Sequence, residues 1–320
     1  MTRAFVFPGQ GSQSIGMGKA LAESFAEARE VFERINDALG QDLTKVMWEG
    51  AESDLNLTEN TQPALFAVSM AVVRILKKQG GIRISEAGAF VAGHSLGEYS
   101  ALTAVKALEL DDSARLLRAR GRAMQRAVPV GQGGMAAILG LDFESVSALA
   151  RENAATNTDG DGVCEAANDN APGQVVISGH LEAVQRFMAL AQGHGAKRAI
   201  MLPVSAPFHC RLMAPAAAEM AKALAQVTIR PPSIPVVCNV SAKAEDEPGR
   251  IRQLLVDQIT GRVRWRESIQ WMAGANVTEV VELGAGKVLS GLTRRIDDRL
   301  AAFNAGTPAE IEALIRHIKG

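Results

Sequence analysis

Short apolar runs alternate with longer segments of helical spacing along most of the chain. The run AFVF at residues 4–7 ends at the turn PGQGSQ and is typical of a buried strand. Residues 17–38 have the spacing of a helix, and residues 62–80 have the apolar content of a buried helix. AGAFVAG at 87–93 then predicts another strand, followed by a helix from 96 to 108. This alternation indicates a mostly parallel sheet with helices on both faces.

The order of predicted elements changes between residues 127 and 201. The segment reads as GGMAAILGL strand, DFESVSALARENAA helix, VCEAAND strand, GQVVISG strand, LEAVQRFMALAQ helix and KRAIML strand. This β-α-β-β-α-β order is the ferredoxin-like pattern. We therefore predict an α/β fold in which residues 1–126 and 202–320 form one large domain and residues 127–201 form a small ferredoxin-like insert.

The C-terminal part returns to the first pattern. An alanine-rich helix is predicted at 214–225, followed by the proline-punctuated strand PPSIPVVCNV. The rest reads as a helix at VRWRESIQWM, a strand at VTEVVELGAG, a further helix and a final helix ending in IEALIRHIKG. Both ends of the chain are thus assigned to the large domain.

Composition and charge narrow the possible partners. The 320 residues are 47% hydrophobic and 22% charged, which is typical of a soluble globular protein. The net charge is −1, with acids and bases interleaved, so we expect no nucleic acid as a partner. The three cysteines lie far apart and match neither a zinc site nor a disulfide framework, which favours a reducing cytoplasm. No apolar run reaches membrane-spanning length, so we expect neither export nor membrane insertion.

Ser95 lies in the pattern G-x-S-x-G, formed by residues 93–97. Alone this pattern arises by chance in about one chain in ten of this length. The predicted strand before it and helix after it are what a nucleophile elbow requires. A helix that begins after Ser95 also points free N–H groups at a developing oxyanion. The alternative is a serine that only caps a helix.

A nucleophilic serine needs a base, and His209 is the candidate among the five histidines. His209 lies in PVSAPFHC, a loop containing Pro203 and Pro207, and catalytic groups are often on loops. The alternative is a histidine satisfied within a core loop. No acid lies in an obvious position to orient this imidazole, so the sequence does not support a Ser-His-Asp triad.

Two further patterns have ordinary explanations when they are taken alone. Five arginines fall on one predicted helix and are typical of a solvated face: Arg115, Arg118, Arg120, Arg122 and Arg126. ELGAGKVL resembles a phosphate loop, but Val281 stands where that loop needs glycine and Val288 where it needs Ser or Thr. No dinucleotide fingerprint or metal-ligand cluster occurs, so the sequence implies neither a cofactor nor a metal.

Taken together, the ordered motifs resemble the malonyl-CoA:acyl carrier protein transacylase family. This family supplies the acyltransferase of type II fatty acid synthesis and also occurs in polyketide synthases. The matching stretches cover nearly the whole chain: FVFPGQGSQ, GHSLGEYSAL, RARGRAMQ, GGMAAILG, NAPGQVVISG, PVSAPFHC, VRWRESIQWM and ELGAGKVLSGL. The resemblance implies an α/β-hydrolase-like domain that carries a ferredoxin-like insert.

The resemblance also implies a role for each matching residue. Ser95 would be the acylated nucleophile and His209 its general base. The backbone carbonyl of Gln258 would orient the imidazole, in place of an acid. The backbone N–H groups of Gln10 and Leu96 would form the oxyanion hole.

The residues that would bind the acyl group follow in the same way. The resemblance selects Arg120 as the residue that holds the free carboxylate of malonyl by two parallel hydrogen bonds. Met124 and Phe208 would line the acyl pocket. Many bacterial relatives have serine at the position of Phe208, and this departure leaves malonyl as the expected acyl group while disfavouring α-branched groups.

The expected activity is ping-pong transfer of malonyl from malonyl-CoA to holo acyl carrier protein, by a monomer that needs no cofactor. Two alternatives remain. A serine thioesterase or esterase would transfer to water, although the missing acid and the otherwise unpaired Arg120 argue against it. A non-catalytic scaffold would not need Ser95 and His209. The sequence does not choose between fatty acid and polyketide synthesis.

Overall fold

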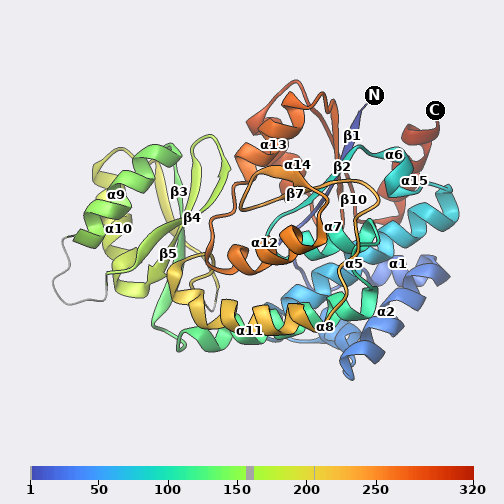
Figure 1. Cartoon of the computed structure of the whole chain (residues 1–320), viewed down its shortest axis with the longest axis horizontal. Coiled ribbons are helices and arrows are strands. Elements are labelled where there is room, and N and C mark those ends of the chain that lie inside the picture. The colour runs from blue at the N-terminus through green and yellow to red at the C-terminus, as the bar shows by residue number, and fades with distance from the viewer. Residues whose placement is uncertain (1, 156–161, 205) are drawn as a thin grey trace.

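The computed structural model describes residues 2–155, 162–204 and 206–320. Residues 156–161 of the predicted insert and Ser205 of PVSAPFHC lie outside the described residues. A six-stranded sheet and a separate four-stranded sheet organise the chain. In Figure 1 the smaller sheet and two helices form the left part of the molecule, and both ends of the chain lie with the larger sheet on the right. The predicted α/β fold, with a mostly parallel sheet and a second sheet, is confirmed.

The large sheet has β1 near its centre, in the order β10-β9-β1-β2-β7-β8. All neighbouring strands are parallel except β8, which runs antiparallel to β7. The strands are β1 (Arg3–Phe7), β2 (Phe90–Gly93), β7 (Val236–Cys238), β8 (Lys243–Glu245), β9 (Glu279–Leu283) and β10 (Ala301–Ala305).

Helices pack on both faces of this sheet because both faces of β1 are apolar. Phe5 and Phe7 are fully buried in one core, while Ala4 and Val6 are fully buried in another on the opposite face. Burying each phenylalanine contributes about 1.5–3 kcal/mol. The helices of this part are α1 (Lys19–Ser24), α2 (Ala26–Leu39), α3 (Leu43–Glu49), α4 (Glu52–Asn56), α5 (Thr58–Gly80), α6 (Ile84–Ala87), α7 (Gly97–Ala104), α8 (Leu110–Ala127), η1 (Arg211–Met213), α11 (Ala214–Ala225), α12 (Pro248–Thr260), α13 (Trp265–Gly274), α14 (Val288–Ile296) and α15 (Pro308–Lys319).

The smaller sheet is antiparallel and has the order β4-β5-β3-β6. Ala136 and Ile138 of β3 face a core that they share with the two helices of this part, whereas Met135 faces the opposite side and belongs to the main core. Its elements all fall within residues 127–201: β3 (Gly133–Leu139), α9 (Phe143–Ala155), β4 (Cys164–Ala171), β5 (Gln174–His180), α10 (Leu181–Gly193) and β6 (Arg198–Met201).

The smaller sheet is joined to the rest of the molecule through β4. Asn168 forms a parallel bridge with Val263, and the Asp169 amide donates to the Val263 carbonyl at 2.9 Å. Arg266, on α13, donates to both carboxylate oxygens of Asp169 at 2.8–3.0 Å. Asp169 is 1% exposed, so this ion pair is shielded from water on one side.

Some predicted boundaries are wrong. The helix predicted at 17–38 is two helices, because Phe25 adopts an extended backbone between α1 and α2. The short strands β8 and β10 were not predicted, because three to five residues at a sheet edge carry little periodicity.

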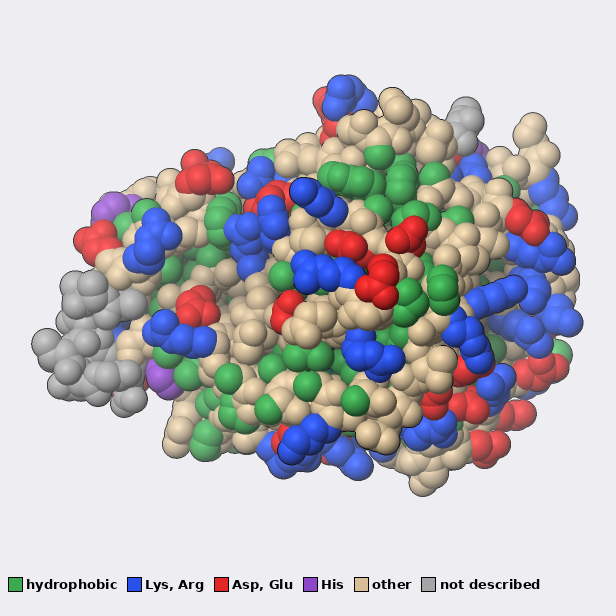
Figure 2. Space-filling view, in the orientation of Figure 1, with side chains coloured by type: hydrophobic (Ala, Val, Ile, Leu, Met, Phe, Trp, Pro, Cys, Tyr) green, Lys and Arg blue, Asp and Glu red, His purple; other side chains and the backbone are tan. Residues whose placement is uncertain are grey.

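None of the described helices is both long and apolar enough to cross a membrane. On the face shown in Figure 2, basic and acidic side chains are interspersed.

Helix α5 begins at Thr58, before the predicted start, and contains Pro63. Pro63 has no N–H to donate to the carbonyl of Glu59, four residues earlier. The Nε of Arg118 donates to that carbonyl instead, at 3.0 Å. The proline therefore helps to join α5 to α8, which carries Arg120 toward the interior.

Candidate active site

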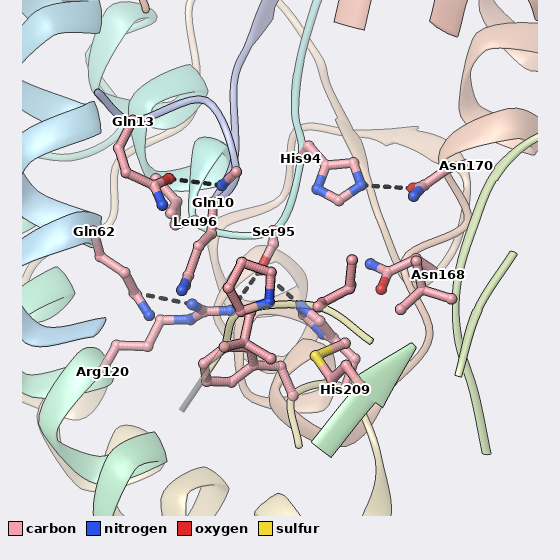
Figure 3. A pocket seen from close by; sticks show the side chains of 17 residues that line it. Gln10, Gln13, Gln62, His94, Ser95, Leu96, Arg120, Asn168, Asn170 and His209 are labelled. Carbon is pink, nitrogen blue, oxygen red and sulfur yellow. Dashed lines mark hydrogen bonds between the residues drawn. The ribbon is translucent and has the colours of Figure 1, made fainter. Parts of the chain in front are cut away.

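A cavity of about 200 Å³ lies where the carboxyl end of β2 meets the smaller sheet. Figure 3 shows Ser95, His209 and Arg120 converging in it. Its walls come from both parts of the molecule and include Gln10, Gly11, Gln13, Gln62, His94, Ser95, Leu96, Arg120, Met135, Asn168, Asn170, Val176, Leu202, Pro203, Val204, Phe208 and His209.

Ser95 occupies a sharp turn between β2 and α7. Its φ of 51° is in the left-handed region, which is strained for a residue with a side chain. The turn is possible because its flanking glycines carry no Cβ: one at Gly93 would lie 1.9 Å from the Gly97 backbone, and one at Gly97 would lie 2.3 Å from the Phe7 carbonyl oxygen. This is the geometry of a nucleophile elbow.

The side chain of Asn239, immediately after β7, holds this turn by two hydrogen bonds. The Ser95 amide donates to Asn239 Oδ1 at 2.7 Å, and Asn239 Nδ2 donates to the Gly93 carbonyl at 2.7 Å. Asn239 is fully buried, so water cannot replace these bonds. One side chain therefore fixes the backbone on both sides of the strained serine.

His209 lies against the serine hydroxyl. Its Nε2 is 2.7 Å from Ser95 Oγ, and its Nδ1 is 2.8 Å from the Gln258 carbonyl and 3.1 Å from the Gly261 carbonyl. Because carbonyl oxygens only accept, Nδ1 carries the hydrogen and Nε2 is free to accept a proton from Ser95.

The environment of His209 favours the neutral imidazole. Burial, and then the positive charge of Arg120, lower its pKa to about 3, against the smaller opposing effect of the Gln258 and Gly261 carbonyls. A neutral imidazole at physiological pH has a lone pair available as a base.

Arg120 approaches the same serine from α8. It is 1% exposed, and its Nη2 donates to Ser95 Oγ at 3.0 Å and to Gln258 Oε1 at 2.9 Å. Its Nη1 donates to Gln62 Oε1 at 2.9 Å. Burial lowers the pKa of Arg120, but a guanidinium stays protonated in proteins. Its hydrogen-bond partners among the described residues are thus all uncharged, which leaves a buried cation facing the cavity.

The other predicted residues divide into those that line the cavity and those behind it. Gln10, Leu96 and Phe208 line it. Met124 is buried but is not among the lining residues; its Sδ accepts from Gln62 Nε2 at 3.7 Å. Met124 therefore contacts the cavity wall indirectly, through Gln62.

Several residues of the site were not predicted from sequence. Gln62 stands at the predicted start of the helix 62–80, and Asn239 directly follows the apolar run of β7. Glu98 is the one charged residue of α7 and is buried, which indicates a specific partner. His94 Nε2 donates to Asn170 Oδ1 at 2.9 Å, and no sequence signal links these two residues.

The described residues contain no group of three or more His, Cys, Asp or Glu side chains placed to hold a metal ion. The chemistry available within the cavity is that of a serine hydroxyl between a neutral imidazole and a guanidinium. Such a site can accept an acyl group on Ser95 and hold an anionic substituent of that group beside it.

Comparison with known proteins agrees with this chemistry. The profile of the family described as "Acyl transferase domain" matches residues 4–295, which defines the class of the protein as an acyltransferase. The malonyl CoA-acyl carrier protein transacylase of Escherichia coli strain K12 is 47% identical over 312 residues, covering 98% of each chain. That of Bacillus subtilis strain 168 is 42% identical and covers 99% of this chain and 97% of its own.

A solved structure gives the same result. The acyl-carrier-protein S-malonyltransferase of Bartonella henselae matches with a TM-score of 0.95 and 51% identity over 100% of both chains. The chain therefore belongs to the malonyl CoA-acyl carrier protein transacylase family. A related malonyl-transacylase, solved in complex with a type II polyketide synthase acyl-carrier protein, has a TM-score of 0.94 and 41% identity, over 99% of this chain and 100% of its own.

Proposed function

We propose that the chain transfers malonyl from malonyl-CoA to the phosphopantetheine thiol of acyl carrier protein through a malonyl ester of Ser95. The placement of Ser95 Oγ within hydrogen-bond distance of both His209 Nε2 and Arg120 Nη2 carries this proposal. One neighbour is suited to activate the hydroxyl, and the other to hold a carboxylate next to it.

In the first half-reaction, His209 Nε2 takes the proton of Ser95 as Oγ attacks the thioester carbonyl. The C–S bond then breaks, and the imidazolium returns the proton to the departing CoA sulfur. In the second, the carrier thiol gives its proton to the same nitrogen, its sulfur attacks the malonyl ester, and Ser95 Oγ is reprotonated as it leaves. The Gln258 carbonyl holds the imidazole in the required tautomer.

The negative charge that develops on the carbonyl oxygen needs donors that have no other partner. The backbone N–H groups of Gln10 and Leu96 are proposed for this role. Both residues line the cavity, and no hydrogen bond from either amide is found among the described residues. Leu96 also directly precedes α7, whose N-terminus favours negative charge.

Arg120 would select a malonyl group by its free carboxylate. Two parallel hydrogen bonds from a buried guanidinium discriminate strongly against an acyl group without this charge. A bound carboxylate would also offset the positive charge that lowers the pKa of His209. The imidazole is then a stronger base when the malonyl group is in place.

The finer features of the fold are proposed on the same basis. The large sheet with its nucleophile elbow supports an α/β-hydrolase-like domain of residues 1–126 and 202–320. The β3-α9-β4-β5-α10-β6 order and the antiparallel sheet support a ferredoxin-like insert of residues 127–201. We propose that the protein acts as a cytoplasmic monomer without a cofactor.

Intact-protein mass spectrometry after brief incubation with malonyl-CoA tests the activity. We expect a malonyl adduct on the wild type, none on Ser95→Ala, and a slower adduct on Arg120→Ala. Holo acyl carrier protein should discharge the adduct. If water clears the adduct as fast as the carrier protein does, the protein is a hydrolase, and an adduct on Ser95→Ala would place the nucleophile elsewhere.

A further inference from the structure

Glu98 is a buried carboxyl group that the proposed reaction does not use. It lies in the first turn of α7, three residues after Ser95, and is 1% exposed. Carboxylates are rarely buried to this degree unless a specific partner requires them. Gln258 Nε2 donates to Glu98 Oε2, and the Cys238 thiol is a second side-chain partner.

The side chain of Gln258 connects Glu98 to the reacting groups. On one end, Oε1 accepts from Arg120 Nη2 at 2.9 Å. On the other end, Nε2 donates to Glu98 and to the Ser95 carbonyl, the latter at 3.0 Å. Arg120, Gln258 and Glu98 thus form one buried chain of hydrogen bonds.

The direction of the Gln258 amide decides whether Arg120 keeps one of its three hydrogen-bond partners. If the amide turned over, its NH₂ group would face the guanidinium, and its oxygen would face Glu98. Both contacts would then be repulsive, because a guanidinium only donates and a carboxylate only accepts. An ionised Glu98, together with the Ser95 carbonyl, which accepts from the same nitrogen, therefore excludes the reversed amide.

Resting on the proposed function, we propose that Glu98 is a positioning residue that acts through the Gln258 amide to keep Arg120 directed at Ser95. The malonyl carboxylate then meets a guanidinium that is already in place. A glutamine at position 98 could either donate or accept, so only the uncharged oxygens of Ser95 and Asn239 would still oppose the reversed amide.

The charge state of Glu98 supplies a readout that a purely structural role would not change. Burial raises its pKa to about 7, against the opposing effects of hydrogen bonds from Gln258, the Asn239 backbone and Cys238 and, last, of the Arg120 charge. The titratable or charged groups that face it are Arg120 from α8, Cys238 from β7 and Tyr99 on its own helix. Burial raises the pKa of Cys238 well above its usual value and that of Tyr99 to about 12. Glu98 is therefore the member of this group that changes charge near neutral pH.

Rapid-quench measurement of Ser95 malonylation tests the proposal with wild type, Glu98→Gln, Arg120→Ala and the double variant. At pH 8 we expect Glu98→Gln to slow acylation roughly tenfold or more. In the Arg120→Ala background, the same substitution should have no further effect, because its route to the substrate is already lost. Additive losses would overturn the proposal.

Glu282→Gln is the matched control. Glu282 is also fully buried, but it accepts hydrogen bonds from Leu289 and Ser290 at the start of α14. We expect this variant to malonylate at the wild-type rate at temperatures where it is folded. Equal losses from the two glutamine variants would mean that Glu98 only supports the fold.

The wild-type pH profile tests the same point without a substitution. The acylation rate should rise through an ionisation near pH 7 as Glu98 loses its proton, and this step should be absent in Glu98→Gln. A step that persists in the variant would overturn the proposal. A wild type that forms no malonyl adduct would instead refute the proposed function, so the two failures are distinguishable.

Discussion

Asn239 is the residue on which the strained serine turn depends most directly. Asn239→Ala removes the partners of the Ser95 amide and the Gly93 carbonyl, both next to a residue with φ of 51°. Each buried group left unpaired costs about 1–3 kcal/mol. We expect the free energy of unfolding in urea to fall by roughly 2–6 kcal/mol and malonylation of Ser95 to slow at least about tenfold. An unchanged acylation rate would show that the turn holds without this side chain.

Two buried titratable groups of the site have opposite effects on stability. The pKa of His209 falls from 6.5 to about 3, so between these values the unfolded chain binds a proton that the folded chain does not. The pKa of Glu98 rises from 4.5 to about 7, so between these two values the folded chain binds a proton that the unfolded chain does not. His209 therefore makes stability fall as the pH falls, and Glu98 makes it fall as the pH rises, each by about 1.4 kcal/mol per pH unit.

These two slopes cancel in the wild type where the windows overlap, from pH 4.5 to 6.5. Relative to the wild type, Glu98→Gln should therefore gain stability as the pH rises through this window, and His209→Ala should lose it. Urea denaturation at several pH values measures both differences. Parallel curves for the three proteins would show that neither group is shifted in this way.

Local sequence patterns indicated the residues with a chemical signature, whereas the residues that orient them were missed or, like Gln258, came from the family resemblance. Ser95 and His209 stand out because glycines or prolines surround them. Arg120 is one of several arginines on its helix, and only the family resemblance selected it. Asn239, Gln62 and Glu98 act through contacts between segments far apart in the chain, which no local pattern encodes.

At the level of elements, the close approach of α8 to α5 sets the position of Arg120. A Cβ at Gly121 would lie 2.6 Å from both Glu59 Cα and the Thr58 carbonyl oxygen. Gly121→Ala gains about 1 kcal/mol of helix propensity, but overpacking costs about 1–3 kcal/mol. We expect a net loss of stability in thermal denaturation, together with slower malonylation, because α8 must move away from Gln62.

Gly291→Ala in α14 is the matched control, because a Cβ there meets nothing within 4 Å. Only the helix propensity changes, so this variant should be more stable by up to about 1 kcal/mol and should malonylate normally. If both variants gained stability, the contact between α8 and α5 would be looser than the structure indicates.

The long elements were predictable and the short ones were not. The helix at 214–225 and the strand–helix order of the smaller part follow from periodicity and turn residues. The break between α1 and α2 at Phe25 contains no glycine or proline from which it could be predicted. Strand β10 pairs with β9 at a sheet edge, and its five residues form a strand because of that partner.

At the scale of the whole molecule, the cavity exists because the two parts of the molecule meet. β2 presents Ser95, while β4 contributes Asn168 and Asn170 and β5 contributes Val176 to the opposite wall. Sequence patterns predicted both sheets but could not predict how the two parts contact each other. The contact depends on tertiary bonds such as the Asp169–Arg266 pair, which joins residues 97 positions apart.

Breaking the Asp169–Arg266 pair should therefore change the shape of the cavity more than the arrangement of Ser95, His209 and Arg120. Asp169→Asn leaves Arg266 without its carboxylate partner, and disrupting a largely buried ion pair costs roughly 3 kcal/mol. Asn168 and Asn170, the neighbours of Asp169, line the cavity and would shift with β4. We expect a higher KM for malonyl-CoA in steady-state assays with a smaller change in kcat, because Ser95, His209 and Arg120 are held by other contacts.

Glu86→Gln is the control for this prediction, since Glu86 and Arg83 form an ion pair in which both side chains are about 60% exposed (61% and 59%). An exposed pair contributes about 0–1 kcal/mol, so stability and KM should stay near those of the wild type. If Asp169→Asn lowered kcat as strongly as it raised KM, the junction of the two sheets would position the reacting groups as well as the walls. Equal KM values for the two variants would mean that β4 keeps its place without this ion pair.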